Sequence, residues 1–145
     1  MTEYDQQLIE RKLSHISRYL LLLKAKSILD QETFLADTDQ QLATERLIQL
    51  LVEISSDLGA HLIVAKRGDA PTTYRDFFKQ MGDMKIISDP LAQQLMLAAG
   101  MRNRLVHEYE DIDLTVVFET IPIATSVFTQ FLKEINAYLA KDYEV

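Results

Sequence analysis

Apolar residues recur at spacings of three and four along most of the chain, and this pattern constrains the fold more than any other feature. In residues 4–29, for example, Ile9, Leu13, Ile16 and Leu20 fall on one face of a helix. Only four glycines and three prolines are present, which leaves little room for a turn-rich β fold. The sequence predicts an all-α, single-domain, up-and-down bundle of about five helices over residues 1–145. The other helices are expected over residues 38–67, 73–81, 90–108 and 113–140.

Capping residues predict where these helices begin. Residues 30–40 are polar and are expected to form an irregular connection, with Asp37 or Thr38 as the N-cap of the second helix. Asp89 stands directly before a proline, which favours Asp89 as the N-cap of the fourth helix and the proline as its first helical residue. Asp113 is the expected N-cap of the fifth helix.

A patch of small residues lies on the second predicted helix, at Ser55, Ser56, Gly59 and Ala60. Small side chains allow another helix to approach closely. The neighbour could belong to the same chain or to a second copy of it, and the sequence leaves both possibilities open.

Composition excludes several classes of protein. There is no cysteine, which rules out disulfides and thiolate–zinc sites. The formal net charge of −7 argues against a sequence-independent nucleic-acid coat, so RNA would have to bind in a local basic cleft. The first residues lack the basic and apolar regions of a signal peptide, and the longest apolar run, residues 19–23, is too short to span a bilayer. We therefore expect a cytoplasmic protein without a membrane partner.

Sequence motifs for metal and nucleotide binding are absent. The three histidines, His15, His61 and His107, do not pair with one another at helical spacing, and there is no phosphate-binding glycine loop. Residues 108–113 contain four carboxylates but lack the glycine and the terminal glutamate of a calcium loop. Favourable charge at a helix start is the simpler interpretation of this run, and a loosely held magnesium ion is the alternative. We expect no metal and no cofactor in this chain.

Residues 102–109, with the sequence RNRLVHEY, bring an arginine, an amide, a histidine and a tyrosine together. Arg102 and Tyr109 interrupt an otherwise apolar helical seam, so the guanidinium must be paired or face a cleft. Asn103 and His107 are four residues apart and share a helix face, and the long arginine side chain can reach round towards them. Arg102, Asn103 and His107 could therefore converge on one phosphate.

These residue types suit RNA cleavage without a metal ion. Histidine can take a proton from the 2′-hydroxyl or give one to the leaving 5′-oxygen, and arginine stabilises charge on a phosphorane-like transition state. An amide can hold the phosphate or the histidine tautomer. A single histidine cannot supply both acid and base, and a two-fold dimer would bring a second copy opposite the first. The residues also allow a structural interpretation, in which Arg102 pairs with a carboxylate and His107 caps a helix end.

The pattern Arg102-Asn103-x-x-x-His107-x-Tyr109 resembles the R-x4-H-x-Y signature of the HepT toxins, a branch of the HEPN superfamily of helical ribonucleases. The similarity also includes residues 71–77, the Leu-rich fourth helix and the segment that ends at Asp113, so it covers essentially the whole chain. It implies a HEPN-like homodimer whose two motifs face one cleft, with metal-independent endoribonuclease activity. By motif position, Arg102 and His107 would be catalytic and Asn103 would support them.

The resemblance also implies a partner and a modification. The chain would be the toxin of a type VII toxin–antitoxin system in the prokaryotic cytoplasm, cleaving tRNA or mRNA. An MntA-like minimal nucleotidyltransferase antitoxin would use ATP and magnesium to add AMP to Tyr109, so these cofactors would belong to the partner. AMP places a phosphodiester charge and a bulky nucleoside beside Arg102, where they would compete with substrate phosphate. Two alternatives are a non-catalytic helical adaptor that docks a nucleotidyltransferase and a helical domain that binds a small nucleotide.

Overall fold

The computed structural model describes residues 5–66, 68–69 and 71–143, and within these ranges all regular structure is helical. The expected helix ends at residue 4 and Arg67 lie outside the described residues. Two short 3-10 helices, η1 and η2, join or follow the α-helices. The elements in chain order are α1 (Gln6–Ala25), η1 (Lys26–Ile28), α2 (Gln31–Ala36), α3 (Thr38–Ala65), α4 (Tyr74–Asp83), α5 (Asp89–His107), η2 (Tyr109–Asp111) and α6 (Leu114–Tyr143).

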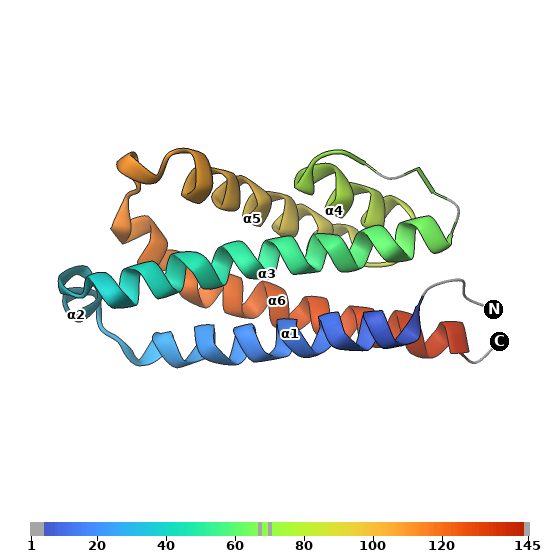
Figure 1. The fold of residues 1–145 in the computed structure, drawn as a ribbon, viewed down its shortest axis with the longest axis horizontal. Helices are drawn as coiled ribbons and strands as arrows, with labels where there is room; N and C mark the ends of the chain where they lie inside the picture. Colours follow the sequence, from blue (N-terminus) through green and yellow to red (C-terminus); the bar gives the residue numbers. More distant parts are fainter. Residues whose placement is uncertain (1–4, 67, 70, 144–145) are drawn as a thin grey trace.

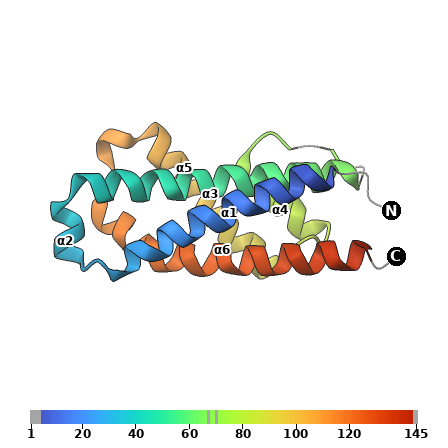
Figure 2. The same ribbon diagram turned by 60° about the horizontal axis from the view of Figure 1, so that its bottom comes forward.

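The long helices run up and down the long axis of the molecule, which confirms the predicted bundle (Figure 1). α1 lies along one side of α3, and α4 and α5 lie along the other side; Figure 2 shows α1 crossing between α3 and α6. One buried apolar cluster draws on all six α-helices, and its largest buried side chains include Phe34, Phe78, Phe128 and Phe131. The end of α5 and the turn of η2 lie at the same end of the bundle as α2 (Figure 1).

The connection predicted over residues 30–40 is wrong in part, because it contains the helix α2. Asp30 caps this helix by accepting a backbone hydrogen bond at 2.7 Å, and Phe34 is fully buried. The Phe34 ring packs against Phe118 of α6 with 5.4 Å between ring centroids. Asp37 caps α3 as predicted. A single buried side chain in six residues gives no periodic signal, which explains why the sequence pattern missed α2.

The start of α5 also differs from the prediction. Ser88 is the N-cap and its hydroxyl accepts a hydrogen bond from the Leu91 N–H at 3.3 Å, whereas Asp89 is the first helical residue. Glu134 of α6 explains the choice, because its carboxylate accepts hydrogen bonds from the Ser88 backbone N–H at 2.7 Å and from the Ser88 hydroxyl at 3.1 Å. The N-terminus of α5 is therefore attached to α6 at this point.

Part of the small-residue patch is covered by α4 of the same chain. Ser55 and Ser56 are buried, and a Cβ added at Gly59 would collide with the Met81 thioether of α4. The buried Met81 side chain of α4 packs directly against position 59, which favours glycine there. The predicted cap at Asp113 is confirmed, since its side chain accepts hydrogen bonds from backbone N–H groups in the first turn of α6. Thr73 caps α4 by accepting a hydrogen bond from the Asp76 N–H at 3.1 Å, and the sequence allows either Thr72 or Thr73 in that role.

Two helices, α3 and α6, are long and apolar enough to cross a membrane by length and composition alone. The most apolar 18-residue window has a mean hydropathy of 1.5 within Thr38–Ala65 and 1.3 within Leu114–Lys141. Both helices contribute to the shared core, where Leu51, Leu58 and Phe128 are fully buried. Helices at the centre of a bundle have the same composition, so this property is weak evidence for insertion into a bilayer.

Candidate active site

Arg102 lies near the end of α5, and its guanidinium is held by a residue from another helix. Its Nε donates a hydrogen bond to Glu53 Oε2 of α3 at 3.1 Å. The two side chains are only 13% and 28% exposed. The structure therefore meets the requirement that an arginine on this apolar seam be paired.

Two further contacts fix the guanidinium plane. The Cζ atom of Arg102 lies 4.5 Å from the ring centroid of Tyr74, the first residue of α4, in a cation–π arrangement. The Arg102 Nη1 group donates a hydrogen bond to Asn103 Oδ1 at 3.3 Å. Residues from α3, α4 and α5 thus surround one cation.

His107 is the last residue of α5 and is exposed. Among the residues that the structure describes, its imidazole has no hydrogen bond, ion pair or ring contact with another side chain. The structure brings Arg102 and Asn103 together but does not join His107 to them. The His107 side chain faces solvent at the end of α5.

Tyr109 leaves the helical seam that was expected to hold it. α5 ends at His107, Glu108 is its C-cap, and Tyr109 begins the 3-10 helix η2 with 69% of its surface exposed. The interpretation of Tyr109 as a seam residue is therefore wrong, because the chain turns before the helix completes that heptad. Its hydroxyl is open to an enzyme that approaches from solvent.

One surface hollow borders the Arg102 contacts. It has a volume of about 370 Å³ and is lined by residues of α3 and α4 that include Glu53 and Tyr74. A smaller hollow of about 180 Å³, between the end of α5 and the start of α6, includes Arg104 and Glu108. Neither Arg102 nor His107 lines either of these two hollows, so the hollows border the motif and do not include its arginine or histidine.

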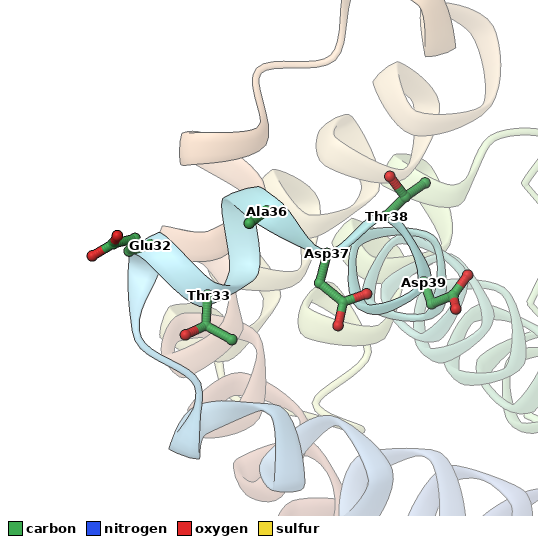
Figure 3. A pocket seen from close by; sticks show the side chains of 6 residues that line it. All are labelled: Glu32, Thr33, Ala36, Asp37, Thr38 and Asp39. Atoms are coloured by element: carbon green, nitrogen blue, oxygen red, sulfur yellow. The ribbon is translucent and has the colours of Figure 1, made fainter.

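A hollow of about 570 Å³ lies at the junction of α2 and α3, and none of its lining residues belongs to the motif (Figure 3). Three carboxylates line it, and that of Asp37 already caps α3. Negative charge disfavours an RNA phosphate at this place. The lining residues are Glu32, Thr33, Ala36, Asp37, Thr38 and Asp39.

The acidic run over residues 108–113 does not form a cluster with metal-ligand geometry. Among the described residues, no group of three or more His, Asp or Glu side chains could hold a metal ion. Asp113 instead caps α6 by accepting backbone hydrogen bonds from Thr115 and Val116. This supports the helix-capping interpretation of that carboxylate.

The pairing of Arg102 with Glu53 fits the structural interpretation of this arginine, and comparison with known families shows which family the chain belongs to. A family model described as HepT-like ribonuclease matches residues 9–135, a range that includes all of α5 and η2. The chain belongs to the HepT-like ribonuclease family. As a ribonuclease of this family, it carries its R-x4-H-x-Y pattern at the end of α5, where Arg102 is held and His107 is exposed.

Similar proteins agree with this assignment. The HepT-like chain is 36% identical to the tRNA nuclease HepT of Aphanizomenon flos-aquae over 139 residues, which cover 96% of this chain and 95% of that protein. It is 28% identical to the mRNA nuclease HepT of Shewanella oneidensis over 90 residues, 62% of this chain and 68% of that protein. A solved structure of the tri-AMPylated HEPN toxin of Shewanella oneidensis in complex with MNT antitoxin has a TM-score of 0.83. That structure is 25% identical, and the match covers 92% of this chain and 99% of that one, which confirms the HEPN-like fold.

Sequence reasoning missed two residues of this HepT-like site, Glu53 and Tyr74. The apolar seam indicated that Arg102 needs a partner, but the partner lies 49 residues away along the chain. No local spacing connects such residues. The sequence showed only that Arg102 needs a partner, and did not show which residue that partner is.

Proposed function

We propose that this HepT-like ribonuclease is the toxin of a toxin–antitoxin pair and cleaves RNA with Arg102 and His107 as catalytic residues. Asn103 supports them through its contact with the Arg102 guanidinium. The observation that carries the proposal is a guanidinium fixed by neighbours from three helices, five residues before an exposed imidazole. Fixed donors stabilise developing charge better than mobile ones, because they need no reorganisation during the reaction.

The chemistry needs no metal ion. A histidine takes the proton of the 2′-hydroxyl, and the resulting oxygen attacks the adjacent phosphorus. Arg102 stabilises the charge on the non-bridging oxygens. The bond to the 5′-oxygen breaks, and a protonated histidine returns a proton to that oxygen. The products are a 2′,3′-cyclic phosphate and a free 5′-hydroxyl.

A homodimer supplies the second histidine in this proposal. His107 is exposed and makes no side-chain contact within the described part of the protomer, so it can face the same group of a second copy. A two-fold axis near the end of α5 places both motifs against one strand of RNA. The protein as a whole is acidic, with a net charge of −7, so the shared groove would supply the locally basic surface that RNA binding needs.

The antitoxin in this proposal is an MntA-like nucleotidyltransferase that modifies Tyr109. The Tyr109 oxygen attacks the α-phosphorus of ATP, pyrophosphate leaves, and the phenolic proton passes to solvent or to a base of the partner. The 69% exposure of Tyr109 supports access by such an enzyme, and the Shewanella oneidensis toxin is tri-AMPylated in its complex with MNT antitoxin. ATP and magnesium are bound by the partner and not by this chain.

tRNA is the favoured substrate and mRNA the alternative. The relative that matches 96% of this chain is a tRNA nuclease, whereas the mRNA nuclease matches 62% of it. The proposal includes a location in the prokaryotic cytoplasm, where tRNA and mRNA are found.

Expression in growing cells tests toxicity. We expect the wild-type chain to arrest growth and His107→Ala to permit it at the same protein level, because the variant lacks the proton-transfer group. Growth that is unaffected by wild-type protein would instead support a non-catalytic adaptor of a nucleotidyltransferase. Tyr19→Phe on α1 is a matched control that should remain toxic.

A further inference from the structure

We infer that Glu53 is a positioning residue, which holds the Arg102 guanidinium with its phosphate-binding edge free. The inference rests on the proposed catalytic role of Arg102. Its structural basis is the 3.1 Å hydrogen bond from Arg102 Nε to Glu53 Oε2, together with the stacking of the guanidinium on Tyr74.

Some N–H donors of the Arg102 guanidinium are already hydrogen-bonded within the protein, and the others remain available to bind phosphate. Of the five N–H donors of a guanidinium, Nε–H is taken by Glu53 and one on Nη1 is taken by Asn103. The remaining donors are on Nη1 and Nη2, at the end of the side chain. This end can bind two phosphate oxygens while Glu53 keeps its own bond.

The supports of Arg102 are rigid because they come from packed helices. Glu53 lies in the middle of α3, between the buried Val52 and Ser55. Tyr74 begins α4, which Thr73 caps. A side chain on a core helix moves little, so the guanidinium it holds is fixed relative to the fold.

Electrostatics add a second effect. The four carboxylates of residues 108–113 lie after His107 along the chain and would attract a mobile arginine. The Arg102 side chain is only 13% exposed, and its hydrogen bond to Glu53 holds the guanidinium away from those carboxylates. Glu53 therefore lowers the reorganisation needed when phosphate arrives, an effect that appears in kcat more than in KM.

Steady-state RNA cleavage separates positioning from stability. We expect Glu53→Ala to lower kcat about 100-fold with KM changed by less than about 3-fold, as a misplaced catalytic group does. Glu53→Gln retains an oxygen that can accept the Nε–H, so it should recover most of the loss. Asp57→Asn is the matched control, because Asp57 lies one turn along α3 and pairs with Lys12. Its kcat should equal that of wild type.

Wild-type kcat in folded Glu53→Ala would overturn the inference. If Glu53→Ala does not fold, the test uses Glu53→Gln instead, and its effect on kcat is measured both in wild type and in Arg102→Lys. A lysine has no Nε–H of this kind, so Glu53→Gln should lower kcat in wild type by several-fold and have no further effect in Arg102→Lys. Equal losses in both backgrounds would also overturn the inference.

The Arg102 side-chain Nε–H resonance tests the geometry without using activity. We expect slow exchange of this proton with water in wild type and in Glu53→Gln, and fast exchange in Glu53→Ala. Slow exchange in a wild-type protein that cleaves no RNA would leave the Glu53 contact standing and contradict the proposed function alone. Fast exchange in an active wild-type protein would contradict the positioning role alone.

Discussion

Arg102 and Tyr109 differ in burial, and the difference separates their proposed roles. The Arg102 side chain is 13% exposed and has partners on three helices. Tyr109 is 69% exposed on a single turn of 3-10 helix. A fixed cation suits the stabilisation of charge, whereas an exposed phenol suits modification by a second protein.

Tyr109→Phe tests the modification site. The change removes the hydroxyl that would attack ATP but keeps the ring, so RNA cleavage should stay within about 3-fold of wild type. Co-expression with the nucleotidyltransferase should then fail to neutralise the variant. Intact mass measures this directly: wild-type protein should gain one or more AMP units and the variant none. An AMP adduct on Tyr109→Phe would place the modification elsewhere.

At the scale of elements, replacing two helical glycines by alanine should change the free energy of unfolding in opposite directions. In α3, Gly59→Ala would drive a Cβ into Met81, an overpacking cost of about 2 kcal/mol that the better helix propensity of alanine offsets by about 1 kcal/mol. In α5, Gly100 has open space around its Cβ position, so Gly100→Ala should stabilise by about 1 kcal/mol. Denaturant unfolding of both variants measures the difference. A gain of stability in Gly59→Ala would contradict the close approach of α4.

The attachment of α5 to α6 predicts a dependence of stability on pH. Burial would raise the pKa of Glu134, but hydrogen bonds from Gln130 and from the Ser88 backbone and hydroxyl outweigh it and hold the pKa below its ordinary value of 4.5. A carboxylate with a lowered folded-state pKa contributes stability above the unfolded-state pKa and loses it as pH falls through the folded-state value. Glu134→Gln should therefore lower the free energy of unfolding by about 1 kcal/mol at pH 7.

The difference between Glu134→Gln and wild type should shrink as pH falls below 4.5 and disappear once the pH is below the lowered folded-state pKa, where the wild-type carboxylate becomes protonated. Urea unfolding at a series of pH values measures this. Glu119→Gln, an exposed change on the same helix, is the control and should track wild type throughout. A difference that persists unchanged at acid pH would show that the charge of Glu134 is not what holds Ser88.

At the scale of the whole molecule, periodicity was enough to predict the bundle and five of its six α-helices. Each of those helices buries a regular stripe in the core, and such stripes are visible in sequence. α2 was missed because Phe34 alone anchors it, and the N-cap of α5 was misplaced because Glu134 selects Ser88 from a distance. Tertiary contacts override local preference in both cases.

The candidate site was predictable to a similar degree. The R-x4-H-x-Y spacing lies within eight residues of sequence and identified Arg102, His107 and Tyr109 together. Glu53 could not be identified, because an ion pair across 49 residues leaves no pattern. The expected position of Tyr109 on the helical seam failed because α5 ends two residues earlier.

The most direct measurement is the initial rate of tRNA cleavage by purified wild type, Arg102→Ala and His107→Ala in the presence of EDTA. The account predicts that the wild type leaves 2′,3′-cyclic phosphate ends and that each variant is slower by about 100-fold or more, because each lacks a group that acts in the transition state. A His107→Ala protein that cuts at the wild-type rate, or a wild-type protein that EDTA inactivates, would contradict it.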